Sequence, residues 1–202
     1  MAVTAGRLPS CYAALMKQRA IYAIMTAGGA VGMIAAFLQT LEKITLLKNK
    51  DAVLACNFNS VFSCSNVLNA WQSSVFGFPN SIMCLTLFTI FASIALAGLS
   101  GGRLPKGLRL GIQALSLFTL GFALWFLAES IYVIGSLCVF CIFCFVGLLA
   151  VNWGWLRLNA ADLPIGVNGR ARLARAIAVG GDVFGWFVVG ALVAFAMLLR
   201  FS

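Results

Sequence analysis

Cysteine is the residue type that gives this chain its chemistry. The sequence holds seven cysteines, five acidic residues and no histidine. Without imidazole, most hydrolytic mechanisms and most zinc sites lose their usual base or ligand, and five acids supply a carboxylate pair poorly. Two cysteine pairs stand out by their spacing: Cys56 and Cys64, with seven residues between them, and Cys138 and Cys141 in a Cys-x-x-Cys motif. These pairs indicate thiol–disulfide chemistry.

The Cys138-Val-Phe-Cys141 motif stands at the start of an apolar stretch. Ser136 is expected to cap a helix there, which would put Cys138 in its first turn. Residues three apart on a helix lie about 5–6 Å apart at Cβ, and a small adjustment brings them within disulfide reach. The positive helix end favours a thiolate. The alternative is that both are small apolar residues inside a spanning helix.

Cys56 and Cys64 fall between the first two apolar stretches. Two cysteines in a loop outside the cytoplasm either staple that loop or exchange disulfides. Exchange is favoured, because thiolate attack needs a mobile partner with an accessible sulfur and because the Cys-x-x-Cys motif is expected at the same membrane face. The other three cysteines, Cys11, Cys84 and Cys144, are expected to be inert apolar residues.

The elements that must position these cysteines are transmembrane helices. The sequence is 62% hydrophobic and only 9% charged, which indicates the bilayer as its solvent. We therefore predict an all-α membrane protein, with a catalytic bundle of four transmembrane helices and a fifth transmembrane helix. The first apolar stretch is longer than that of a signal peptide and lacks a cleavage site, so it is expected to be retained. The predicted spans are residues 20–41, 82–99, 108–127, 137–156 and 183–199.

The basic residues predict the orientation in the membrane. Ten of the fourteen lysines and arginines fall on the side of the N-terminus and four on the other side. The positive-inside rule then puts the N-terminus in the cytoplasm, and the C-terminus and both cysteine pairs outside. Basic residues between apolar spans report orientation, so nucleic acid is not expected as a partner. The predicted units are a cytoplasmic segment (1–19), the four-helix core (20–158) with an outer loop (42–80), a basic cytoplasmic loop (159–182) and the fifth helix (183–202).

The second half of the outer loop predicts a short amphipathic helix over residues 65–76, with Val67, Leu68, Trp71 and Val75 on one side. Gly77-Phe78-Pro79-Asn80 ends it. Such a helix either lies in the interface with its tryptophan at headgroup level, or covers a site at the outer end of the bundle as a lid. The two interpretations are compatible.

Three sequence features in this order resemble the bacterial branch of the vitamin K epoxide reductase family, over about residues 20–156. They are Cys56…Cys64-Ser-Asn-Val-Leu-Asn, then Phe76-Gly-Phe-Pro-Asn80-Ser, then Cys138-Val-Phe-Cys141. Many bacterial members continue after the fifth helix into a thioredoxin-like domain. This sequence ends at Ser202, so the electron donor is expected to be a separate protein.

The resemblance implies a role for each cysteine of the two pairs. Cys141 would face a quinone bound at the outer end of the bundle. Cys138 would exchange disulfides with Cys64, and Cys56 would meet the external thiol partner. Electrons would then run from a partner dithiol through the loop pair and the Cys-x-x-Cys pair to the quinone.

The resemblance also implies binding residues and partners. Ser65 and Asn80 correspond to polar positions near the bound ring. The quinone would be menaquinone or ubiquinone, with no metal involved. The partner would be a periplasmic DsbA-like or thioredoxin-like dithiol protein, and the enzyme would support disulfide bond formation from within the bacterial inner membrane and its lipid.

Three other classes of protein are weighed against this one. A DsbB-type oxidase has its Cys-x-x-Cys motif early and its spaced pair late, which is the reverse of the order here. A eukaryotic vitamin K epoxide reductase shares the four cysteines, but Gly-Phe-Pro and a fifth span favour the bacterial branch. A tetraspan-like scaffold with a structural loop disulfide predicts that Cys138 and Cys141 stay reduced and inert, which thiol trapping would reveal.

Overall fold

The computed structural model describes residues 8–49 and 51–201, with side chains from Met16 onward. Five of its helices are long and apolar enough to cross a membrane, as the sequence predicted. Helices suit this solvent because they satisfy every backbone polar group internally. The five are α1 (Leu8–Lys48), α3 (Asn80–Leu99), α4 (Lys106–Glu129), α5 (Val139–Asn159) and α7 (Gly181–Phe201). The shorter elements are α2 (Cys64–Asn69), the 3₁₀-helix η1 (Trp71–Ser74), the π-helix η2 (Ser130–Ile134) and α6 (Val167–Ala178).

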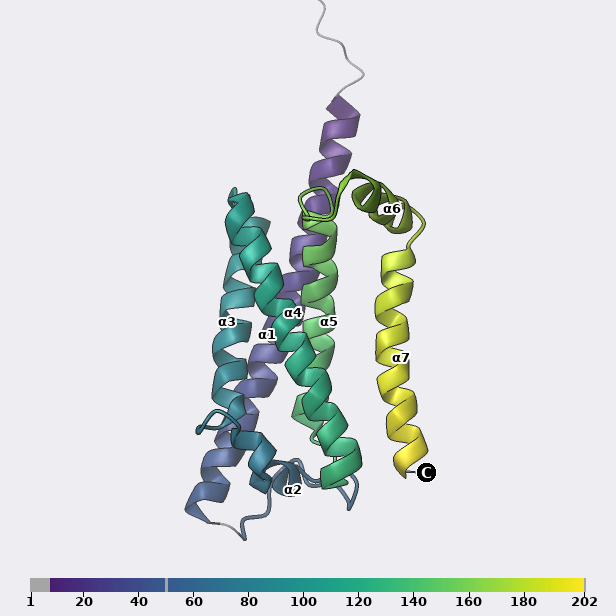
Figure 1. The fold of residues 1–202 in the computed structure, drawn as a ribbon. Coiled ribbons are helices and arrows are strands. Elements are labelled where there is room, and N and C mark those ends of the chain that lie inside the picture. The colour runs from purple at the N-terminus through teal and green to yellow at the C-terminus, as the bar shows by residue number, and fades with distance from the viewer. Residues whose placement is uncertain (1–7, 50, 202) are drawn as a thin grey trace, which may run out of the picture.

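Helices α1, α3, α4 and α5 form the bundle, with α1 packed against both α3 and α5, and α4 packed against α5 (Figure 1). Helix α7 stands beside α5 at the edge of the bundle. Helix α2 and the loops around it lie at the same end as η2 and the end of α7, while α6 lies at the opposite end (Figure 1). Both cysteine pairs therefore belong to one end of the molecule.

Small residues let α1 approach its neighbours closely. A Cβ atom added to Gly147 of α5 would lie 2.5 Å from the backbone oxygen of Gly28, and one added to Gly32 would lie 2.1 Å from the ring of Phe88. In a membrane, where lipid is as apolar as leucine, such close contact supplies much of the attraction between helices. The spacing between α1 and α5 is therefore fixed by glycine.

Polar side chains join the helices at the end away from the cysteines. The Oδ1 atom of the buried Asp182, at the start of α7, accepts a hydrogen bond of 3.0 Å from Nη2 of Arg157 in α5. The Arg157 guanidinium also lies 4.8 Å from the centre of the Trp153 ring. Asp182 is the only buried residue of α7. This pair attaches the start of α7 to the bundle, and partly buried apolar side chains along the helix, among them Trp186 and Met197, pack against the core.

The single amphipathic helix predicted over residues 65–76 is wrong. The chain forms α2 and then η1, separated by an extended Ala70 with φ −65° and ψ 144°. The carbonyl oxygen of Leu68 accepts hydrogen bonds from Ser73 Oγ and from Lys43 Nζ. Those side chains take the place of the backbone N–H that a continuous helix would have supplied, so the helix stops there.

Two segments that were predicted as loops are partly helical. Helix α1 continues to Lys48, so the first residues of the outer loop are helical. With 41 residues, α1 is about 60 Å long, twice the thickness of the hydrocarbon core. The basic segment between α5 and α7 contains α6, a helix with no buried residue.

Candidate redox site

The two cysteine pairs meet at one end of the bundle. Cys56 and Cys64 form a disulfide with a Cα–Cα distance of 5.7 Å. Cys64 is the first residue of α2, and its Sγ atom lies 3.4 Å from that of Cys138, which directly precedes α5. Cys138 and Cys141 are free thiols. The four predicted cysteines thus form a continuous series from the loop to α5.

Backbone contacts hold the loop against the turn before α5. The Leu137 N–H donates to the Val61 carbonyl at 2.7 Å, and Phe62 pairs with Leu137 in an isolated parallel bridge. Ser63 caps α2 by accepting from a backbone N–H in its first turn. These contacts fix the positions of Cys64 and Cys138 relative to each other.

The expectation that Ser136 caps α5 is wrong. The residue in the capping position is Cys138, which has an extended backbone (φ −100°, ψ 120°). The Ser136 hydroxyl accepts a hydrogen bond of 3.0 Å from Asn66 Nδ2 and donates to the Ser60 carbonyl at 3.4 Å. Ser136 therefore ties α2 to the turn before α5, and its hydroxyl does not cap α5.

The surroundings of Cys138 favour its thiolate form. The pKa of its thiol is lowered, chiefly by a hydrogen bond from the Cys141 thiol and further by the backbone N–H groups of Cys141 and Phe140. Burial and the charge of Glu42 act in the opposite direction. The lower pKa favours the thiolate, the form in which a sulfur leaves when a disulfide to it is broken.

The loop disulfide and Cys138 are buried. Cys56 is 3% exposed, Cys64 is 0% exposed and Cys138 is 2% exposed. A loop pair with accessible sulfurs was expected, so on this point the structure differs from the prediction. The neighbours Val53 and Phe58 are, by contrast, 91% and 70% exposed.

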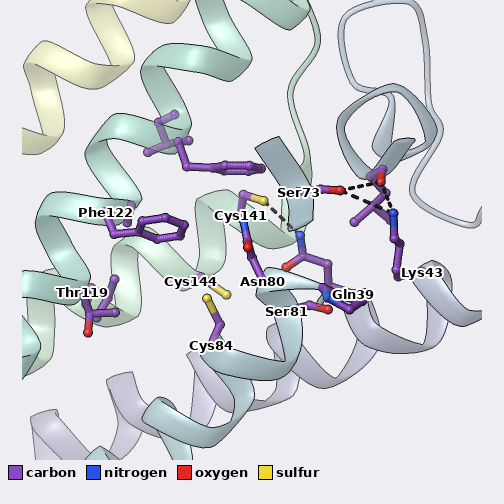
Figure 2. Close-up of a pocket in the computed structure, with 16 residues that line it drawn as sticks. Gln39, Lys43, Ser73, Asn80, Ser81, Cys84, Thr119, Phe122, Cys141 and Cys144 are labelled. Atoms are coloured by element: carbon purple, nitrogen blue, oxygen red, sulfur yellow. Dashed lines mark hydrogen bonds between the residues drawn. The ribbon is translucent and has the colours of Figure 1, made fainter. Parts of the chain in front are cut away.

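A cavity of about 610 Å³, its open mouth included, lies on the other side of Cys141 between α1, α3, α4 and α5. Its lining, largely apolar with a few polar groups, is that of a small-molecule site. Figure 2 shows Phe122 and Cys141 facing the same space. The polar residues that line the cavity are Gln39, Lys43, Ser73, Asn80, Ser81 and Thr119.

Two polar atoms in this lining lack a protein partner. Asn80 donates from Nδ2 to the Gln72 carbonyl at 2.7 Å, which leaves its buried Oδ1 without a hydrogen bond. The buried hydroxyl of the adjacent Ser81 also has none. Buried polar atoms are normally satisfied, so these two are suited to a ligand that carries carbonyl or hydroxyl groups. An oxygen-bearing ring such as a quinone fits that description.

The structure separates the two polar residues that the family resemblance had grouped. Asn80 lines the cavity, whereas Ser65 does not. The Ser65 hydroxyl accepts a hydrogen bond of 2.7 Å from Asn57 Nδ2, and its backbone N–H donates to Asn57 Oδ1 at 3.1 Å. Ser65 therefore braces the loop between Cys56 and Cys64.

Sequence reasoning missed several residues of the cavity. Gln39 donates from Nε2 to the Cys141 sulfur at 3.2 Å, and Ser81 had no signal beyond its place next to Asn80. Cys84 and Cys144, expected to be inert, also line the cavity. The side chain of Cys11 lies outside the described residues. Across the described chain there is no group of three or more His, Cys, Asp or Glu residues able to hold a metal ion.

A four-helix membrane bundle with a disulfide in sulfur contact with a Cys-x-x-Cys motif defines a thiol–disulfide oxidoreductase site. The model of the vitamin K epoxide reductase family matches residues 23–153, well over half of the chain and all four of these cysteines. The chain belongs to this family. Members are membrane thiol–disulfide oxidoreductases that in general use quinone-type electron carriers and pair with thioredoxin-like proteins. A comparison with curated proteins gave no match.

Proposed function

We propose that this protein reoxidises a periplasmic DsbA-like or thioredoxin-like dithiol protein and passes the electrons to a membrane quinone. It would act in the bacterial inner membrane and support disulfide bond formation. One observation carries the proposal: the Cys64 and Cys138 sulfurs are 3.4 Å apart, and Cys141, one helical turn further on, lines the cavity. The scaffold alternative requires neither feature.

The proposed relay begins at the loop disulfide. A partner thiolate attacks the sulfur of Cys56, which breaks the Cys56–Cys64 bond and forms a mixed disulfide. The second partner thiol attacks the partner's own sulfur in that bond and leaves as part of the oxidised partner. Cys56 and Cys64 now hold the two electrons and two protons as thiols.

The second exchange moves the electrons to α5. The Cys64 thiolate attacks Cys138 of a Cys138–Cys141 disulfide, and Cys141 leaves as a thiolate. Cys56 then attacks Cys64, restores the loop disulfide and releases Cys138. One loop disulfide together with the free thiols of Cys138 and Cys141 is the arrangement that this step would leave.

The cavity lining suits the proposed acceptor. Asn80, held by the Gln72 carbonyl, keeps its oxygen free to accept from a hydroxyl, while the Ser81 hydroxyl is free to donate to a carbonyl. Apolar side chains such as Phe122 and Leu148 exclude water from the space beside Cys141. A bound quinone would supply an acceptor for two electrons and two protons.

The distribution of charge and exposed apolar residues supports the proposed orientation and partner. Arg103, Lys106 and Arg109 lie just before α4 or in its first turn, at the opposite end of α4 from η2 and the cysteines. The positive-inside rule assigns that end to the cytoplasm. The exposed Val53 and Phe58 flank the buried Cys56. A protein partner can cover them as it opens the loop, which a small thiol cannot do.

Disulfide trapping in the purified full chain tests the relay. Replacing both Cys56 and Cys141 by alanine leaves Cys64 and Cys138 without their own partners, so mild oxidation should link them, as peptide mass spectrometry would show. Cys141→Ala alone should abolish quinone reduction by a reduced thioredoxin-like protein, whereas Cys11→Ala, at the far end of α1, should not.

Two results would contradict the proposal: no Cys64–Cys138 disulfide in the double variant, or undiminished quinone reduction by Cys141→Ala. Mass analysis of the lipid-soluble molecules that copurify with the chain would identify the acceptor as menaquinone or ubiquinone.

A further inference from the structure

Gln39 is a buried amide whose one hydrogen bond from Nε2 goes to a redox sulfur. It is 7% exposed, and its Nε2 lies 3.2 Å from Cys141 Sγ, although 102 residues separate the two in sequence (Figure 2). A polar side chain inside a transmembrane helix is costly to bury, so its position calls for a role. Its partner here is the sulfur that lines the cavity.

The packing of α1 brings Gln39 to this place. Gly28, Gly32 and Gln39 follow one face of α1 at spacings of four and seven residues, the repeat of a helix. On this face Gly28 meets the backbone of Gly147 in α5, and the Gly32 carbonyl accepts from the Cys144 thiol at 3.6 Å. The glycines draw α1 onto α5, and two turns further along the same face the amide reaches Cys141.

The nearby cation does not compete for this role. Lys43 lies one turn beyond Gln39 on α1 and also lines the cavity. Its ammonium group, however, is engaged by the Leu68 carbonyl and by the Ser73 hydroxyl at 3.4 Å. The side-chain nitrogen placed against Cys141 is therefore the neutral amide.

We propose that Gln39 is a positioning residue that stabilises the Cys141 thiolate and holds it at the cavity wall. This inference rests on the proposed function and deepens it. When Cys64 attacks Cys138 of the Cys138–Cys141 disulfide, that bond breaks and its electron pair goes to Cys141. An N–H donor binds a charged sulfur more strongly than a neutral one, so the amide favours this departure. Only the thiolate form of Cys141 is then ready to give up electrons on the cavity side.

The test uses quinone-free protein, so that the sulfur is observed apart from turnover. Gln39→Met keeps a similar volume and removes the donor, and Gln39→Glu puts a carboxylate acceptor in its place. Labelling of Cys141 by a small alkylating reagent is followed by peptide mass spectrometry. We expect Gln39→Met to slow labelling of Cys141 about tenfold, the effect of losing a hydrogen bond to a charged group.

The glutamate variant gives a signature that packing alone would not produce. Near neutral pH its carboxylate repels the thiolate, so labelling should be slower than in Gln39→Met. As the pH falls the carboxyl group gains a proton and becomes a donor. The ratio of the Gln39→Glu rate to the Gln39→Met rate should therefore rise on acidification, because the titration of Cys141 itself largely cancels in the ratio.

Gln113→Met is the matched control, since Gln113 is also a buried amide and bonds to Asn159 in the bundle away from the cysteines. It should leave Cys141 labelling at the wild-type rate. In turnover, Gln39→Met should lower kcat and leave the KM for quinone unchanged, because the amide acts on sulfur.

A wild-type labelling rate in Gln39→Met, or a flat rate ratio across pH, would overturn the role of Gln39. Either result would leave the relay standing, because the relay is decided separately by the Cys64–Cys138 trap. If the trap failed while labelling still depended on Gln39, the proposed function would be the part at fault.

Discussion

The sulfur atoms of Cys64 and Cys138 lie 3.4 Å apart across 74 residues of sequence, in a part of the fold where both are buried. Contacts outside the two cysteine pairs help to hold both residues in place. Cys64 is the first residue of α2 and Cys138 precedes α5. The Leu137 N–H donates to the Val61 carbonyl, which ties the segment before α2 to the turn before α5. The proposed exchange between the pairs therefore depends on how firmly α2 is tied to the turn before α5.

Asn66→Ala should weaken that tie, because it removes the 3.0 Å hydrogen bond from Asn66 Nδ2 to the Ser136 hydroxyl. A hydrogen bond of this kind is worth about 1 kcal/mol, so we expect the rate of Cys64–Cys138 disulfide formation to fall about fivefold. The rate is measured by quenched oxidation of the trapping variant. Asn69→Ala, in the same helix but without a side-chain hydrogen bond in the described structure, should change it little. Equal rates in all three proteins would contradict the prediction.

The pH dependence of Cys138 follows from its lowered pKa. The thiolate stabilises the fold fully above the ordinary thiol pKa of about 8.5, and this contribution is lost as the pH falls through the lower native value. Alkylation of Cys138, with the loop pair reduced, should therefore have its midpoint below about 8.5. Cys141→Ala removes the principal hydrogen-bond donor and should move the midpoint upward. A midpoint that stays in place would show that the backbone N–H groups alone lower this pKa.

Gly147→Ala should destabilise the bundle, because the added Cβ would lie 2.5 Å from the Gly28 backbone oxygen, which cannot move away as a flexible side chain can. Overpacking of this kind costs about 1–3 kcal/mol. Thermal unfolding in detergent measures the loss. Gly121→Ala is the matched control, since a Cβ there meets nothing within 4 Å. If both variants unfolded at the wild-type temperature, the close contact of α1 and α5 would not contribute to stability.

Asp182→Ala should loosen the start of α7 from the bundle, because it leaves the Arg157 guanidinium without its carboxylate. Removing one partner of a buried ion pair lowers the free energy of unfolding by about 3 kcal/mol. Limited proteolysis between α5 and α7 should then be faster. Replacing both residues by leucine should be milder than Asp182→Ala, since no buried charge is left alone. The reverse order would indicate that α7 is held by apolar contacts.

The sequence was sufficient to predict the five spans and the meeting of the cysteine pairs. Hydropathy over about 20 residues is a strong signal, because no other structure satisfies the backbone in lipid as simply as a helix. Counting spans then places Cys56, Cys64, Cys138 and Cys141 at one end, whichever way the chain is oriented.

The parts that could not be predicted depend on contacts between distant segments. The break at Ala70 follows from Lys43 and Ser73 binding the Leu68 carbonyl, which no local pattern reveals. Gln39 is one polar residue in an apolar span, and its partner is 102 residues away. Side-chain hydrogen bonds across a bundle leave no periodic trace in the sequence.

The burial of Cys56 has a consequence for selectivity. With 3% of its surface exposed, its sulfur is closed off from the glutathione-sized thiols that pass by in the surrounding water. In the proposed relay, the loop disulfide would therefore react only after a protein partner had engaged the loop, so the closed loop would select macromolecular substrates over small thiols. A solvent-exposed disulfide would instead be reduced by the most abundant small thiol and would not select a particular protein partner.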